Sequence, residues 1–307
     1  MCQKLRMALI AVIIMGTGSS LIAQTFLQAC TQSDASKKDD DGLSADVDSL
    51  KTATASFVGN VEGFNCTMYD RALKKMHGLQ LSGHNFHHLE LLQDMHALES
   101  LDISRNGLTT ASGVGHLSHL KAIDVSLNNI SDITELPALS NLESLRMEDN
   151  QVNDIHAIAA LGDLRELWAD FNSISDISPI GNLPNLLWVH LSSNKIERLS
   201  GFETFLSTPG IFDISNNEIK DFGLLDETLR KRVIITGNPA QKEQLDALLT
   251  KVPAMIVELY GDTLTVESIK DSYAEHKDVV GCPAPSSVTY KSGFDFTRYS
   301  PACGPEW

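Results

Sequence analysis

Four of the side chains between residues 148 and 190 are candidates for proton exchange on one face of the protein. Glu148, Glu166 and Asp170 are carboxylates and His190 is an imidazole, the residue types that serve as general acids and bases in enzymes. Trp168 stands among them, between Glu166 and Asp170. The chain has no nucleophile motif, phosphate-binding loop or metal-ligand spacing that would turn these residues into a catalytic site. We therefore expect a binding protein rather than an enzyme, with no cofactor and no metal.

The residues around Trp168 alternate between apolar and polar, which is typical of a strand with one buried face. Leu167 and Ala169 occupy one face, so Trp168 shares the other, wet face with Glu166 and Asp170. Binding would explain an indole in this position, since tryptophan and arginine dominate binding hot spots. The alternative is that the indole only covers the sheet and packs against an arginine.

This strand belongs to a series of repeats of 22 residues that runs from residue 76 to residue 239. Five copies follow the pattern L-x-x-L-x-L-x-x-N-x-I, and about eight repeats are recognisable, although the first has His84 at the asparagine position. The regularly spaced copies begin at Leu98, Leu120, Leu142, Leu164 and Leu186. One repeat cannot bury its apolar face alone, but stacked repeats form a continuous aliphatic core. The period therefore predicts a solenoid.

The pattern resembles the 22-residue leucine-rich repeat of the internalin type, and it covers more than half of the chain. The resemblance implies an α/β solenoid with a curved parallel sheet on the concave face. Short helical or extended turns then form the convex face, and a cap closes each end. One asparagine per repeat is expected to form a hydrogen-bonded ladder in the bends between strands. Proteins with this repeat type are mostly interaction proteins, although a fold is weak evidence for a particular partner.

If the apolar strand positions point inward, the large side chains of the middle repeats gather on the concave face. The candidate binding residues are Arg146, Glu148, Glu166, Trp168, Asp170, Phe171, Trp188 and His190. Both indoles are then expected to face the same water-filled hollow. The acidic surroundings favour a cationic or neutral protein or peptide as the partner of a monomer. A glycan is the alternative ligand, because tryptophan faces beside carboxylates also suit sugar rings.

Charge excludes one class of partner. The chain carries 24 basic and 40 acidic residues, a net charge of −16. Nucleic acid is therefore not expected to bind.

The N-terminus is typical of an export signal, with Lys4 and Arg6 before a short apolar run. Residues 27–30 resemble the lipobox of bacterial lipoproteins, which implies a signal peptide over residues 1–29 and lipidation at Cys30. We then expect a flexible tether over residues 30–52 and a helical cap over residues 53–75. The protein would be anchored in the cell envelope through this lipid, with the outer membrane favoured by Thr31. Ordinary cleavage near Ala23 or Ala29 is the alternative and would give a secreted protein.

The C-terminal part, residues 240–307, is expected to cap the other end of the solenoid. Cys282 and Cys303 bracket a segment poor in core-forming residues, so we predict a disulfide between them. Lipidation of Cys30 would leave Cys66 free and buried. Without lipidation, the same four thiols allow three pairings.

Overall fold

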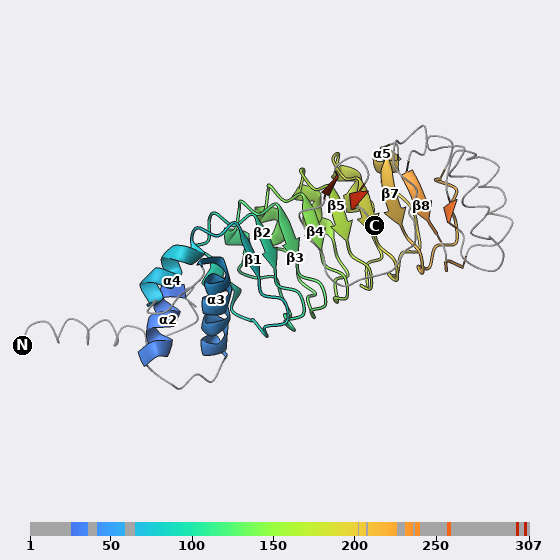
Figure 1. Cartoon of the computed structure of the whole chain (residues 1–307). Helices are drawn as coiled ribbons and strands as arrows, with labels where there is room; N and C mark the ends of the chain where they lie inside the picture. The colour runs from blue at the N-terminus through green and yellow to red at the C-terminus, as the bar shows by residue number, and fades with distance from the viewer. Residues whose placement is uncertain are drawn as a thin grey trace, which may run out of the picture.

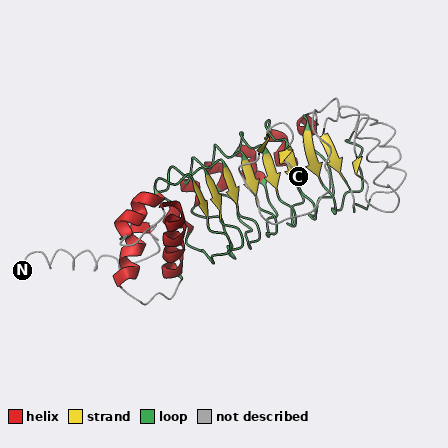
Figure 2. Cartoon of the chain, viewed as in Figure 1, coloured by secondary structure: helices red, strands yellow, loops and turns green. Residues whose placement is uncertain are grey.

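The computed structural model is a solenoid with one row of parallel strands (Figures 1 and 2). It describes residues 26–35, 42–58, 65–201, 203–206, 208–225, 231–235, 237–239, 257–258, 299–300 and 304–305. Short helical turns follow the strands on the convex side. The predicted fold class, a leucine-rich-repeat solenoid, is confirmed.

One strand per repeat forms the concave sheet, and the strands lie side by side in the order of the sequence. The strands are β1 Gly78–Gln80, β2 Ser100–Asp102, β3 Ala122–Asp124, β4 Ser144–Arg146, β5 Glu166–Trp168, β6 Trp188–His190, β7 Gly210–Asp213, β8 Lys231–Ile234 and β9 Val257–Glu258. From β1 to β6 each residue pairs with the residue 22 positions later, as Arg146 pairs with Trp168. Equivalent residues of successive repeats therefore line up across the sheet.

The aliphatic positions of each repeat fill the interior. Leu164 and Leu167 are completely buried, as are Leu142 and Leu145 one repeat earlier. Short 3-10 helices close most of the turns on the convex side: η1 Leu89–Leu92, η2 Val114–His116, η3 Leu136–Ala138, η4 His156–Ala160 and η5 Ser178–Asn182. A short α-helix, α5 (Glu203–Leu206), serves the same purpose near β7. Each turn contributes one layer to a continuous core, as expected for stacked repeats.

The predicted asparagine ladder is confirmed. Asn128 is nearly buried, and its amide group donates hydrogen bonds to the carbonyls of Ile103, Val125 and Ser126. Its side-chain oxygen accepts from the backbone N–H groups of Asn106 and Leu108, each at 3.0 Å. The side chain thus satisfies buried backbone groups in the bend, where no strand partner is available.

Three helices close the N-terminal end of the solenoid beside β1 (Figures 1 and 2). They are α2 Phe26–Ala35, α3 Leu43–Val58 and α4 Cys66–Leu73. The predicted tether over residues 30–52 is therefore wrong, since α2 and α3 occupy most of it. Val47, Leu50 and Thr54 form a stripe at helical spacing on α3, and all three are completely buried. The predicted end of the signal peptide at residue 29 also falls inside α2.

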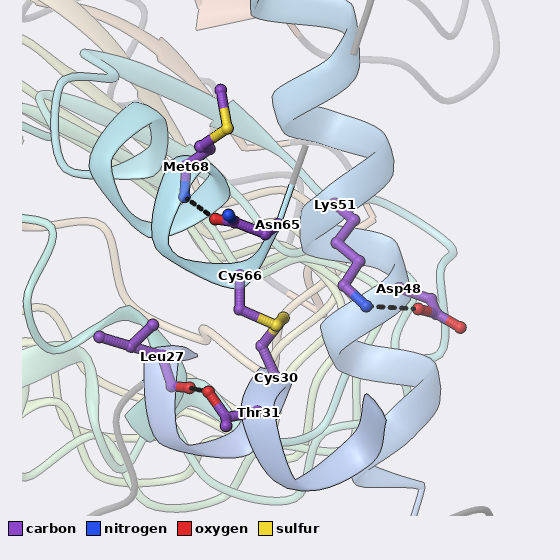
Figure 3. The surroundings of a disulfide bond; sticks show 8 residues. All are labelled: Leu27, Cys30, Thr31, Asp48, Lys51, Asn65, Cys66 and Met68. Atoms are coloured by element: carbon purple, nitrogen blue, oxygen red, sulfur yellow. Dashed lines mark hydrogen bonds and ion pairs between the residues drawn. A yellow bond between two sulfur atoms is a disulfide. The ribbon is translucent and has the colours of Figure 1, made fainter. Parts of the chain in front are cut away.

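A disulfide between Cys30 and Cys66 joins α2 to α4, with the two Cα atoms 5.7 Å apart (Figure 3). Both cysteines are buried. The predictions that Cys30 carries lipid and that Cys66 is free are therefore wrong. Lipidation requires the Cys30 sulfur, and that sulfur is bonded to Cys66.

A buried carboxylate fastens this cap to the first turn of the solenoid. One oxygen of Asp46, on α3, accepts hydrogen bonds from the backbone N–H groups of His87 and His88 at 2.8 Å. The ring Nδ1 of His88 is 2.7 Å from the same oxygen. Charge-assisted hydrogen bonds of this kind are the strong ones. Helix α3 is therefore part of the folded unit.

Several predictions fall on other parts of the chain. The Cys282–Cys303 disulfide and residues 1–25 lie outside the described residues, and so does most of the C-terminal cap over residues 240–307. Strand β9 extends the parallel sheet past residue 239, and β10 (Tyr299–Ser300) pairs antiparallel with β11 (Gly304–Pro305). Among the described residues, none of the helices has the length and apolarity needed to span a membrane.

Candidate functional site

Three of the predicted residues form a stack across the middle of the concave sheet. Arg146, Trp168 and His190 occupy the same register position on β4, β5 and β6. The indole of Trp168 lies parallel to the His190 ring, with centroids 3.8 Å apart and planes within 2°. The guanidinium of Arg146 lies 4.7 Å from the Trp168 ring centroid, in cation–π geometry. Trp168 is therefore held between two polar groups on the concave face.

Glu166 and Trp188 lie at a second register position, one row from this stack. They pair directly with each other across β5 and β6, and Glu166 accepts a hydrogen bond from the Ser144 hydroxyl at 3.1 Å. Trp188 takes the predicted position on the strand but is only 9% exposed. The expectation that both indoles face water is therefore wrong for Trp188. Trp168, by contrast, is partly exposed.

Glu148 and Asp170 lie side by side just after β4 and β5, in the row beyond the stack. Serines flank them in this row, with Ser126 before Glu148 and Ser192 after Asp170. Asp170 accepts a hydrogen bond from the Ser192 backbone N–H at 2.6 Å. Oxygen Oε2 of Glu148 is enclosed and has no hydrogen-bond partner, and the same is true of the Trp168 indole nitrogen. The two residues thus leave one acceptor and one donor unsatisfied, which costs about 1–3 kcal/mol for each group.

Burial changes the proton affinity of three groups in this site. It raises the pKa of Glu148 to about 7, although the nearby Arg146 opposes the shift. Burial also raises the pKa of Asp170 to about 7, and the negative charge of Asp213 adds to the effect. For His190, burial lowers the pKa to about 4, against the attraction of Asp213, whose carboxylate lies 4.0 Å away. The imidazole is therefore neutral at pH 7, whereas the two carboxyl groups are half protonated.

These shifts predict a pH dependence of stability. The folded protein binds the protons of Glu148 and Asp170 more tightly than the unfolded chain does. Protonation of these two groups therefore stabilises the fold fully below about pH 4, and this contribution to the free energy of unfolding is lost as the pH rises through 7. His190 has the opposite effect, with stability lost as the pH falls from 6.5 towards 4. The double variant Glu148→Gln/Asp170→Asn removes the first effect and leaves His190 in place. A change of one in a pKa corresponds to about 1.4 kcal/mol, so we expect this variant to exceed the wild type by several kcal/mol in urea unfolding at pH 8 and to match it near pH 4. An equal difference at both pH values would contradict the raised pKa values.

Phe171 lies outside the stack, on the rim of the concave face. Its side chain is 58% exposed and its backbone has a positive φ of 54°. Two neighbours on the same rim were not recognised from the sequence: Leu127, two repeats earlier, and Asp149 between them. The signal was available, because Leu127 and Phe171 occupy the same repeat position 44 residues apart.

Some of the histidines in the first repeats make hydrogen bonds within the fold. Ring Nδ1 of His84 lies 2.9 Å from the Ser82 carbonyl, and His77 Nδ1 lies 3.3 Å from Glu99. Across the ranges that the structure describes, no three His, Cys, Asp or Glu side chains are grouped so that they could hold a metal ion.

Comparison with known proteins supports the architecture. No protein-family model matches the sequence, and no curated protein is significantly similar to it. Among solved structures, internalin C2 of Listeria monocytogenes is 21% identical over 79% of this chain and 100% of its own, with a TM-score of 0.59. The internalin inlF of the same species is 23% identical, with a TM-score of 0.54. That alignment covers 62% of this chain and only 58% of the inlF chain. On its repeats, its parallel sheet and these structural neighbours, the chain is a leucine-rich-repeat solenoid with the fold of bacterial internalins.

Proposed function

We propose that the protein is an exported module that binds a protein or peptide on the concave face of its solenoid. The observation that carries this proposal is the concentration of large and charged side chains on β4 to β6, where Arg146, Trp168 and His190 form one stack. The outward positions of the first three strands, β1 to β3, carry no aromatic or basic side chain. Arginine and tryptophan at the centre of a concave sheet are the usual residues of a binding hot spot.

The charge of this surface favours a cationic group on the partner. Glu148 and Asp170 adjoin the stack, and Asp124 and Asp213 lie at its two ends in the same register row. A lysine or arginine side chain of the partner would be attracted by these four carboxylates. Such a cation would also lower the pKa of Glu148 and Asp170, so affinity should rise as the pH increases from 6 to 8.

Export is supported by two features. The N-terminal segment has the composition of a signal peptide, and disulfides such as Cys30–Cys66 persist in oxidising compartments. Cleavage near Ala23 would leave α2 intact, because this helix begins at Phe26. We therefore propose a secreted or envelope-associated protein that acts as a monomer.

The proposal predicts that the concave carboxylates are needed for binding. The test is selection of a phage library of random 12-residue peptides on the immobilised protein. We expect the retained peptides to be rich in lysine and arginine. Replacing Glu148 and Asp170 by glutamine and asparagine should reduce their retention at least tenfold, because the partner then loses both counter-charges.

The matched control is Asp163→Asn/Glu218→Gln, which removes two exposed carboxylates outside the concave rows. It should retain the same peptides as the wild type. Equal losses in both double variants would point to net charge alone and contradict a concave site. Retention of cell-wall oligosaccharides but of no peptide would contradict the proposal in favour of a glycan ligand.

A further inference from the structure

One ridge of the solenoid runs along the edge of the concave face. Its residues follow each strand and all have a left-handed backbone, with φ between 51° and 59°. They are Arg105, Leu127, Asp149, Phe171 and Ser193. The N–H groups of Leu127, Asp149 and Phe171 bond to the carbonyls of the next turn at 2.8–3.0 Å. The ridge therefore has the spacing of the strands, about 4.8 Å per repeat.

Two of these residues are unsuited to their backbone. A left-handed conformation favours glycine and asparagine, and it is an outlier for a bulky apolar side chain. The same chain places asparagines, Asn85 and Asn216, in this conformation near the two ends of the series. Leu127 and Phe171 gain no core packing in return, since they are 39% and 58% exposed. Only one other large apolar residue in the described part of the chain, Met68, is exposed to this degree.

Strained and exposed apolar residues in this arrangement indicate contact with another molecule. Leu127 and Phe171 lie two repeats apart, which corresponds to about 10 Å. The exposed carboxylate of Asp149 lies between them on the ridge. In an α-helix, residues i and i+7 lie about 10.5 Å apart on one face, and residues i+3 and i+4 lie between them. The spacing of the ridge thus matches two turns of a helix.

We propose that the ridge of Leu127, Asp149 and Phe171 docks an amphipathic helix of the partner. The helix carries apolar residues at positions i and i+7 and a lysine or arginine at i+3 or i+4. Its apolar residues pack on Leu127 and Phe171, and its cation pairs with Asp149. This inference rests on the proposed function, because the ridge borders the concave site, and it adds the form of the partner.

The test is selection of an alanine-rich helical peptide library in which positions i, i+3, i+4 and i+7 are randomised. We expect the wild type to enrich apolar residues at i and i+7 and basic residues at i+3 or i+4. The double variant Leu127→Asn/Phe171→Asn should retain these peptides at least tenfold less well. Arg105→Asn, on the same ridge but outside the proposed contact, should retain them as the wild type does.

Stability separates a binding role from a structural one. Asparagine tolerates the left-handed backbone, so Leu127→Asn/Phe171→Asn should keep or raise the melting temperature while binding is lost. A marked fall in melting temperature would show that the two side chains serve the fold and would overturn the inference.

The binding results separate the two proposals. Selection of peptides that lack apolar residues at i and i+7 would also overturn the inference, as would equal retention of the selected peptides by the wild type and Leu127→Asn/Phe171→Asn. If Glu148→Gln/Asp170→Asn still fails to retain the selected peptides in either case, the concave site stands and only the ridge contact fails. Retention of no peptide at all would contradict both proposals.

Discussion

Removal of the Cys30–Cys66 disulfide is expected to lower the free energy of unfolding by about 4 kcal/mol. The bond joins cysteines that are 36 residues apart, so it strongly restricts the unfolded chain. It also joins α2 to α4 in the cap that covers the first repeat. The measurement is urea unfolding of the oxidised wild type and of the Cys30→Ala/Cys66→Ala double variant.

The single variants provide the control, because a disulfide makes the two cysteines equivalent. Cys30→Ala and Cys66→Ala should each destabilise the protein about as much as the double variant does. Intact mass should show the loss of two hydrogens in the wild type when the remaining cysteines are blocked. An effect of Cys30→Ala on membrane association, with none for Cys66→Ala, would instead indicate lipidation and contradict the disulfide.

The second large effect is expected from the asparagine ladder. Asn128→Ala removes a side chain that makes five hydrogen bonds with backbone groups. An alanine leaves several buried donors and acceptors unsatisfied, at about 1–3 kcal/mol each. Because some of these groups can relax or admit water, we expect a net loss of about 4 kcal/mol in urea unfolding.

The adjacent Asn129 offers a matched control. Its side chain is exposed and its contact with Gln151 is long, 3.4 Å. Asn129→Ala should change the free energy of unfolding by less than about 0.5 kcal/mol. Similar losses for both variants would mean that the ladder position has no special role.

The period of the sequence was sufficient to predict the solenoid. Aliphatic residues such as Leu142 and Leu164 recur at a fixed interval, and only stacked turns can bury them all on one side. Arg146, Trp168 and His190 are each one interval of 22 residues apart, so the period also predicted that they lie at the same position on neighbouring strands. The asparagine ladder follows from the same interval, since Asn106 and Asn128 hold equivalent positions.

The disulfide and the exposure of the site residues depended on contacts that do not recur from repeat to repeat. The tertiary structure paired Cys30 with Cys66, because α2 and α4 approach each other in the cap, and no spacing in the sequence encodes that approach. It also buried Trp188 while leaving Trp168 partly exposed, although both occupy outward strand positions. Alternation assigns a side chain to a face of the sheet, but its exposure depends on what its neighbours cover. The same reason applies to Glu148 and Asp170: their identity was readable from the sequence, whereas their raised pKa values come from burial in the assembled concave face.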